Sequence, residues 1–303
     1  MREYLKQFNQ DILPEDNWCS HCPPTSECRK THTTLSHICS KCGYEEVIFV
    51  GTKDNILSYF VELNLFDSIK FVDSNCCHVK FTNTKIPTDN TVSHAIKLLE
   101  NYCNVTINHQ VQITKNIPLG SGLGGGSSNG AYTLKALNYL YNLNISDSDL
   151  LFLSKKIGSD VPFFIKGGVK EVTGTGDIIK DINDSYLENK FFVLVIPDFS
   201  ISTSWAYKKI KKYLEPTKIK PKFPPLTDKV DWTLFENDFE QVVCSAYPEI
   251  LDIKNTFYDY GALYSSLSGS GSTMFGIYND MKLAASARKC FKDYHTYLVT
   301  PNV

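Results

Sequence analysis

The stretch that decides the fold runs from residue 118 to residue 129 and reads Pro118-Leu119-Gly120-Ser121-Gly122-Leu123-Gly124-Gly125-Gly126-Ser127-Ser128-Asn129. Five of the seven positions from 120 to 126 are glycine. Glycines let successive backbone N–H groups turn toward a ligand, and they let the main chain approach it closely. A predicted strand through Val111 and Ile113 precedes the stretch, and a predicted helix with Leu134, Leu137 and Tyr141 on its apolar face follows it. Because a helix N-terminus attracts anions, the pattern predicts a polyphosphate-binding loop, with Ser127 or Ser128 as the helix cap.

Two other glycine-loop classes fit less well. Gly120, Gly122 and Gly125 have the spacing of a dinucleotide-binding loop, but no acidic residue lies about 20 positions further on before Asp147 and Asp149, which we assign to a helix start. The Walker pattern requires Lys-Ser or Lys-Thr after the glycines, and the sequence has neither there. A short glycine pattern on its own is also commonly a flexible turn without a ligand.

The elements around the loop predict an α+β fold. Two strands are expected around a turn at 64–67, followed by a helix after Asp89 and Asn90 with Val92, Ala95, Ile96 and Leu99 at helical spacing. A second helix should start at Ser146, with Asp149 three residues on, and stop near Gly158. The composition of residues 161–179 predicts strands joined by tight turns, and that of residues 189–197 predicts a buried strand. Residues 214–229 predict a surface loop, and the remainder predicts two helices and a strand at 273–278.

Length and charge limit the class of protein. The 303 residues favour two domains in the main body, which we place at 55–180 and 181–303 after a divergent segment at 1–54. The 31 Lys and Arg nearly balance the 33 Asp and Glu, so a nucleic-acid or anionic-membrane partner is not expected. The first residues lack the apolar core of a signal peptide and no stretch is long enough to cross a membrane, so we expect a cytoplasmic protein.

Several strings resemble those of one enzyme family. The loop is similar to the phosphate loop of GHMP kinases, and residues 122–129 resemble most closely the 4-diphosphocytidyl-2-C-methyl-D-erythritol kinases. Further resemblances follow in the same order along the chain. They are Ile157-Gly158-Ser159-Asp160-Val161-Pro162-Phe163-Phe164, Gly167-Gly168, Gly174-Thr175-Gly176-Asp177, Pro197 with residues 202–207, Asn237-Asp238-Phe239-Glu240, and residues 267–275.

The resemblance implies a fold, a reaction and site residues. The fold would be the two-domain GHMP architecture, with an N-terminal domain like domain 2 of ribosomal protein S5 and a ferredoxin-like C-terminal domain. The reaction would be transfer of the ATP γ-phosphoryl group to the 2-hydroxyl of 4-diphosphocytidyl-2-C-methyl-D-erythritol, with residues 118–128 binding ATP. Asp160 would be the catalytic aspartate, although an isolated Asp after a helix is more often a cap or an ion-pair partner. Ser127 or Ser128 would help to hold Mg²⁺, and Gly269, Ser270, Gly271 and Ser272 would contact phosphates, although an isolated Gly-Ser-Gly is an ordinary turn.

The first 54 residues do not share the resemblance. The family opens with a strand that carries a catalytic lysine, and Lys41 does not stand in a comparable strand, so no lysine is assigned. Cys19, Cys22, Cys39 and Cys42 instead form two Cys-x-x-Cys pairs separated by 16 residues, which is the spacing of a zinc ribbon. The alternative, which we favour over zinc, is a poorly ordered extension or the product of a wrong start or reading frame.

Three functional hypotheses remain open at this point. The first is the isoprenoid-pathway kinase, with ATP and Mg²⁺, acting as a monomer or weak homodimer. The second is another GHMP kinase, for mevalonate, homoserine or a sugar. The third is a catalytically impaired homologue, without the lysine motif, whose cysteine-rich segment binds zinc.

Overall fold

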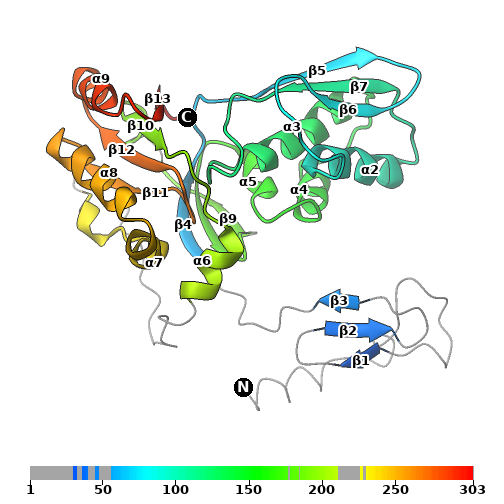
Figure 1. Cartoon of the computed structure of the whole chain (residues 1–303). Coiled ribbons are helices and arrows are strands. Elements are labelled where there is room, and N and C mark those ends of the chain that lie inside the picture. Colours follow the sequence, from blue (N-terminus) through cyan, green and yellow to red (C-terminus); the bar gives the residue numbers. More distant parts are fainter. Residues whose placement is uncertain are drawn as a thin grey trace. The chain divides into compact units, whose positions relative to one another are not determined.

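The computed structural model describes residues 30–32, 36–39, 45–47, 56–176, 178–183, 185–210, 226–227 and 230–302. The chain divides into two compact units, Met1–Asn55 and Ile56–Val303. In the first unit, the described strands form an antiparallel sheet in the order β1-β2-β3: β1 (Lys30–His32), β2 (Ser36–Cys39) and β3 (Glu45–Val47). The elements described below belong to the second unit (Figure 1). The domain limits at 55–180 and 181–303 stay a prediction.

Two three-stranded sheets form the first half of the second unit. One has the order β4-β8-β9 and is antiparallel: β4 (Ile56–Val61), β8 (Val169–Gly174) and β9 (Ile178–Asp181). The other has the order β5-β7-β6, with β7 antiparallel to β5 and parallel to β6: β5 (Ser68–Asp73), β6 (His78–Phe81) and β7 (His109–Thr114). The predicted pair of strands around the turn at 64–67 is confirmed as β4 and β5.

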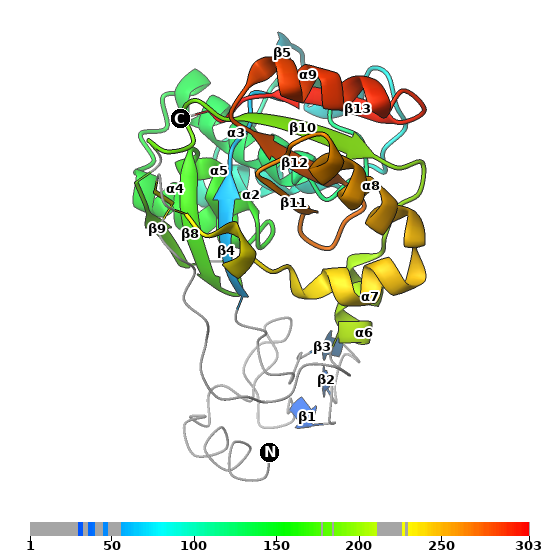
Figure 2. The ribbon, with the colours of Figure 1, turned by 90° about the vertical axis from the view of Figure 1, so that its left-hand side faces the viewer.

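Four helices pack with these sheets: α2 (Thr91–Cys103), α3 (Gly125–Leu140), α4 (Asp147–Lys155) and α5 (Val161–Lys166). Figures 1 and 2 show α3 and α5 next to each other. The predicted caps of α2 and α4 are confirmed, since Asn90 accepts hydrogen bonds from the N–H groups of residues 92 and 93, and Ser146 accepts one from that of Asp149. The buried apolar side chains of α2 and α3 form one core cluster with those of β7, including Leu99, Val111 and Leu134.

Two local predictions are wrong. The cap of α3 is Gly124, at φ +67°, so the helix begins at Gly125, and Ser127 and Ser128 lie inside its first turn. Glycine adopts this left-handed conformation without steric cost, which lets the loop turn straight into the helix. Residues 161–166 form helix α5 and not a strand, with Pro162 in the first turn, where a missing N–H costs nothing. The strand prediction within residues 161–179 holds only for β8 and β9.

The second half follows a β-α-β-β-α-β order. Its sheet has the strand order β11-β12-β10-β13 with all neighbours antiparallel, which is the ferredoxin-like arrangement expected for this half. For the C-terminal part the sequence indicated two helices and one strand at 273–278, which is β12; over residues 230–302 the structure has three α-helices, α7, α8 and α9, and two further strands, β11 and β13. The elements are β10 (Phe191–Ile196), α6 (Thr203–Ile210), η2 (Trp232–Leu234), α7 (Asp238–Ala246), α8 (Pro248–Asp259), β11 (Tyr264–Leu267), β12 (Met274–Tyr278), α9 (Met281–Cys290) and β13 (His295–Val299).

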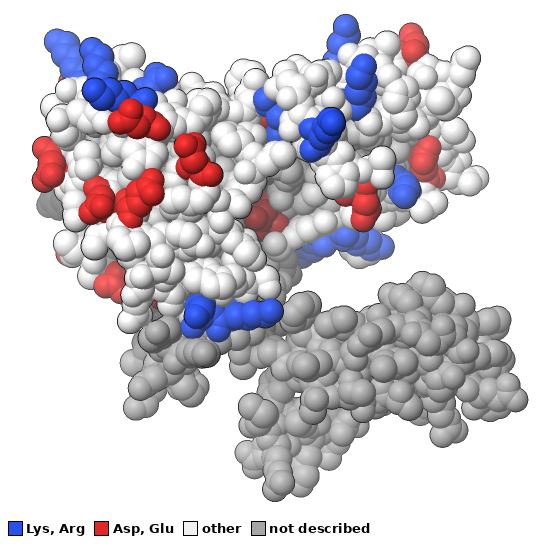
Figure 3. All heavy atoms as spheres, viewed as in Figure 1, with Lys and Arg blue, Asp and Glu red and all other residues white. Residues whose placement is uncertain are grey.

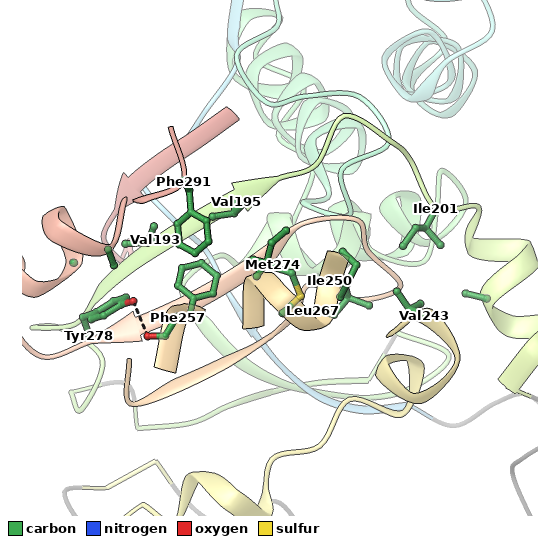
Figure 4. Packing of buried hydrophobic residues seen from close by; sticks show 14 of the residues in the cluster. Val193, Val195, Ile201, Val243, Ile250, Phe257, Leu267, Met274, Tyr278 and Phe291 are labelled. Atoms are coloured by element: carbon green, nitrogen blue, oxygen red, sulfur yellow. Dashed lines mark hydrogen bonds between the residues drawn. The ribbon is translucent and has the colours of Figure 1, made fainter. Parts of the chain in front are cut away.

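The core of this half lies between its sheet and helices α7, α8 and α9. Figure 4 shows Val193, Phe257 and Phe291 packed together, all at most 3% exposed. Tyr278 is fully buried, and its hydroxyl donates to the carbonyl oxygen of Phe257 at 3.3 Å. Burial raises the pKa of this phenol, which therefore stays neutral and satisfied inside the core. The core therefore supports the sheet whose strands β11 and β12 are joined by residues 268–273.

The surface agrees with the balanced composition. On the face shown in Figure 3, Lys and Arg side chains lie in small groups, with Asp and Glu side chains and uncharged surface between them. Within the described part of the chain, none of the helices has the length and apolarity needed to cross a bilayer. Most of the predicted loop at 214–229 lies outside the described residues.

Candidate active site

The glycine loop links β7 to α3. Gly120, Gly122 and Gly124 adopt φ values of +66°, +79° and +67°, which L-residues with side chains rarely adopt. The first intrahelical hydrogen bond runs from the N–H of Ser128 to the carbonyl oxygen of Gly124 at 2.9 Å. The N–H groups of residues 125–127 therefore precede the first intrahelical bond, at the positive end of the helix. This is the arrangement that binds an anion such as phosphate.

A second glycine loop joins β11 to β12. Gly269 and Gly271 have φ values of +56° and +94°, and the N–H of Ser268 donates to the carbonyl oxygen of Thr273 at 2.8 Å. The Asn237 side chain donates from Nδ2 to the carbonyl oxygens of Leu267 and Gly269 at 2.8 and 2.9 Å. The hydroxyls of Ser270 and Ser272 lie near Thr203 Oγ1 and the carbonyl oxygen of Phe199, at 3.0 and 2.7 Å. This loop is therefore fixed by contacts from two other segments, Asn237 before α7 and the connection from β10 to the start of α6.

The two glycine loops touch each other. The Ser268 hydroxyl donates to the carbonyl oxygen of Gly122 at 3.0 Å, and the N–H of Thr273 donates to that of Ser121 at 3.1 Å. A β-carbon on Gly122 would lie 2.7 Å from the carbonyl oxygens of both Ser268 and Gly271, closer than real β-carbons come. The fold thus brings together residues 118–128 and 269–272, about 150 positions apart in sequence, as one continuous backbone surface.

Asp160 occupies the position before α5 and is half-buried. It is the N-cap residue of α5 by position, but its side chain makes no capping hydrogen bond to that helix. Its Oδ1 accepts a hydrogen bond from the Ser159 hydroxyl at 3.1 Å. One turn further along α5, the ring of Phe164 lies 3.0 Å from where a β-carbon on Gly124 would be. The helix that Asp160 begins therefore packs against the end of the first glycine loop.

Asp67 and Asn129 are buried beside this loop, and the sequence pattern assigned no role to either side chain. The Asp67 carboxylate is fully buried and accepts hydrogen bonds from the N–H groups of Asn116 and Ile117 at 2.7 and 2.9 Å. It also accepts one from Nδ2 of Asn129 at 2.9 Å, and it forms an ion pair with Lys115. Asp67 and Asn129 are 62 positions apart, and no local pattern marks such a pair. The only available signal was a carboxylate at the end of the predicted turn at 64–67.

A hollow of about 790 Å³ lies beside the first glycine loop. Pro118 and Leu119 belong to both the loop and the wall of the hollow. The Tyr297 hydroxyl, also in this wall, donates to the carbonyl oxygen of Asn116 at 2.6 Å, which ties β13 to the start of the loop. Burial and the nearby Asp67 carboxylate raise the pKa of Tyr297, so its hydroxyl stays a donor. Other lining residues include Asn83, Thr84, Arg288 and His295.

Metal ligands were predicted at two places. Ser127 and Ser128 lie half-buried in the first turn of α3, where their hydroxyl oxygens suit a hard cation that also binds phosphate oxygens. Among the described residues, no three or more His, Cys, Asp or Glu side chains are grouped so that they could hold a metal ion. The zinc prediction for Cys19, Cys22, Cys39 and Cys42 rests on side chains outside the described part of the chain.

Comparison with known families matches both halves of the main unit. The family description "GHMP kinases N terminal domain" matches residues 90–168, and "GHMP kinases C terminal" matches residues 231–295. A 4-diphosphocytidyl-2-C-methyl-D-erythritol kinase of Thermodesulfovibrio yellowstonii is 38% identical over 253 residues, which cover 79% of this chain and 87% of the relative. One of Chlorobium phaeobacteroides is 35% identical over 253 residues, covering 80% of this chain and 84% of the relative.

Solved structures with the same fold include kinases for different substrates. A crystal structure of 4-(cytidine 5'-diphospho)-2C-methyl-D-erythritol kinase matches with a TM-score of 0.67 at 23% identity, covering 86% of this chain and 92% of that one. A homoserine kinase from Cytophaga hutchinsonii matches with a TM-score of 0.63 at 20% identity, covering 84% and 97%. At these identities the structural matches establish the fold alone.

Proposed function

This chain belongs to the GHMP kinases and, within them, to the family of 4-diphosphocytidyl-2-C-methyl-D-erythritol kinases, and we propose that it phosphorylates the 2-hydroxyl of that cytidyl substrate with ATP. The relatives that carry this name span more than four fifths of their own length in the match. The product would serve the non-mevalonate synthesis of isoprenoid precursors.

The observation that carries the proposal is the contact between the two glycine loops. Phosphoryl transfer depends mainly on positioning and on stabilising charge at the transferred group. The hydrogen bonds from Ser268 to Gly122 and from Thr273 to Ser121 join a loop suited to the ATP phosphates to one suited to a second phosphate group. An acceptor that itself carries a diphosphate fits a site with two such loops.

We assign the chemical roles as follows. The hydroxyl oxygen of the acceptor forms a bond to the γ-phosphorus, the bond from that phosphorus to the bridging oxygen of ADP breaks, and the hydroxyl proton passes to the Asp160 carboxylate. The N–H groups of residues 125–127 bind phosphate oxygens at the start of α3. Ser127 or Ser128 would hold Mg²⁺, which neutralises charge on the β- and γ-phosphates when bound.

The hollow beside the loop is the proposed site of the nucleoside of ATP. Its wall includes Pro118 and Leu119, so a ligand whose phosphates lie on the loop can extend directly into it. A volume of about 790 Å³ exceeds the needs of a purine and a ribose. The hydroxyl of Thr84 offers a polar group for recognition of the base, whereas the Asn83 amide is already hydrogen-bonded to the backbone of Lys115 through both its nitrogen and its oxygen.

The test is a comparison of acceptors. Purified full-length chain with magnesium and ATP should release ADP in the presence of the cytidyl substrate, and mass spectrometry should find one added phosphate on that substrate. Homoserine, mevalonate and galactose serve as controls, and we expect background rates with each. Turnover of one of these controls without turnover of the cytidyl substrate would replace this proposal by another GHMP kinase activity. Nucleotide binding without any turnover would indicate the impaired homologue.

We further propose that the enzyme works in the cytoplasm as a monomer or weak homodimer. The described cysteines Cys76, Cys77, Cys103, Cys244 and Cys290 are free thiols, as is usual in a reducing compartment. Burial raises the pKa of Cys77, Cys103 and Cys244, which keeps these thiols protonated and unreactive. Light scattering after size-exclusion chromatography measures the oligomeric state, and a stable tetramer would contradict the proposal.

A further inference from the structure

The Asp67 carboxylate, whose side chain is 0% exposed, forms hydrogen bonds on both sides of the first glycine loop. Oδ1 accepts both backbone N–H groups at the start of the loop, from Asn116 and Ile117. Oδ2 accepts the Asn129 amide, which stands in the first turns of α3, and the Lys115 ammonium. One side chain therefore binds the segment that enters the loop and the helix that leaves it.

The positive charges near the start of α3 explain why the hydrogen-bond acceptor at position 67 is a carboxylate. The Lys115 side chain is 6% exposed, and its ammonium would lie 3.1 Å from a β-carbon on Gly125, the first residue of α3. A cation beside the positive end of a helix is unfavourable unless a negative charge compensates both. Asp67 supplies that negative charge, so the loop can keep its conformation before a nucleotide arrives.

A glycine-rich loop also needs such an anchor on entropic grounds. Five glycines between residues 120 and 126 lose more backbone freedom on ordering than other residues would. When both ends of the loop are fixed, part of that entropy is lost during folding and not during binding. The consequence is tighter binding of the ligand that uses the loop.

We infer that Asp67, acting with Asn129, is a positioning residue that fixes both ends of the phosphate loop and thereby sets the affinity for magnesium-nucleotide. The inference rests on the proposed function in one respect, that the ligand of the loop is ATP. It assigns no contact between Asp67 and the substrate. Replacement of Asp67 should therefore lower the affinity for nucleotide and leave the affinity for the acceptor nearly unchanged.

The test uses full-length chains and calorimetric titration with magnesium and a non-hydrolysable ATP analogue, which needs no acceptor. In Asp67→Asn, the new amide group faces two donors, Lys115 and Asn129, and we expect analogue affinity to fall at least tenfold. Asn129→Ala removes the hydrogen bond between Asp67 and the start of α3 and keeps the ion pair of Asp67 with Lys115. We therefore expect a smaller loss of analogue affinity, about threefold to tenfold. In turnover assays, KM for ATP should rise by similar factors, with KM for the acceptor within about twofold of its original value.

The control for general loss of stability is Asp280→Ala. Asp280 is another carboxylate that accepts two backbone N–H groups, from Lys282 and Leu283 at 2.8 and 2.9 Å, at the start of α9. Its removal should lower the unfolding temperature without changing analogue affinity. If Asp67→Asn does not fold, Asn129→Ala alone decides the question.

Two results would overturn the inference. One is analogue affinity within twofold of the original in a folded Asn129→Ala or Asp67→Asn chain. The other is an equal loss of ATP and acceptor affinity, which would indicate a general structural role. An original chain that binds the analogue but does not phosphorylate the cytidyl substrate would remove only the proposed function, because the comparison of affinities still applies. An original chain that binds no analogue would overturn both.

Discussion

Gly122 and Gly271 lie so close that a β-carbon on Gly122 would come within 2.7 Å of the carbonyl oxygen of Gly271. Gly122 also has a φ of +79°, so a side chain there is disfavoured by the backbone as well as by its neighbour. The two loops that we assign to ATP and to the acceptor can approach this closely only because residue 122 carries no side chain.

The first prediction concerns this contact. Gly122→Ala should separate the loops, lower the unfolding temperature by several degrees and abolish most of the turnover. The carbonyl oxygens of Ser268 and Gly271 belong to the backbone, so they cannot move aside without distorting the second loop. Gly126→Ala is the steric comparison, since its β-carbon would meet its nearest neighbour, Thr91 Oγ1, at 3.8 Å. Thermal unfolding of both variants measures the difference. Equal unfolding temperatures would show that the close approach is not required.

The second prediction concerns Asp160. Asp160→Asn keeps the shape of the side chain but cannot accept the hydroxyl proton, so kcat should fall about 10² to 10⁴-fold. Binding of magnesium-nucleotide should remain within about threefold, because the role lies in the chemical step. Asp147→Asn, at an exposed carboxylate in the first turn of α4, should retain full turnover. Steady-state kinetics decides, and an unchanged kcat for Asp160→Asn would remove this residue from the mechanism.

The third prediction separates the two roles of Asn237. Its Oδ1 caps α7 by accepting the N–H of Phe239 at 2.9 Å, while its Nδ2 holds the second glycine loop. Asn237→Asp keeps the cap but turns a negative charge toward two carbonyl oxygens, so acceptor KM should rise strongly. Asn237→Ala loses the cap as well, which should cost about 0.5–2 kcal/mol of unfolding free energy from the cap alone.

Denaturant unfolding and acceptor KM, measured on both Asn237 variants, distinguish the roles. A normal acceptor KM in Asn237→Asp would contradict the idea that this amide orders the second loop.

The fourth prediction concerns pH. Burial, and next the hydrogen bond to Glu62, raise the pKa of Tyr132 to about 12. A phenol whose pKa is higher in the folded chain than the ordinary value of 10 stabilises the fold fully below pH 10, and this stabilisation is lost as the pH rises through 12.

Tyr132→Phe should therefore reduce the fall in unfolding free energy between pH 10 and 12. The measurement is the difference between the two chains in denaturant titrations at matched pH, which cancels the other tyrosines and the lysines. An identical pH dependence in the two chains would show that this hydroxyl is not coupled to folding.

The sequence predicted the fold class and the glycine loops because their signals are local. Helical spacing found α2 and α3, the cap residues Asn90 and Ser146 marked two helix starts, and the glycines marked both loops. The short apolar run that forms α5 was misread as a strand, since a buried segment of six residues has no clear period. The hydrogen bonds of Asp67 to residues 115–117 and to Asn129 could not be predicted, because these partners lie about 50 to 60 positions away in the sequence and meet Asp67 only in the folded chain.

The hydroxyl of Tyr297 in β13 holds the start of the phosphate loop, and Thr273 of the second loop holds its middle. The loop is thus attached by hydrogen bonds to the ferredoxin-like half as well as to its own. Moving the two halves apart at this point would break these bonds, so we expect the loop to stay attached to both halves while substrates enter and leave.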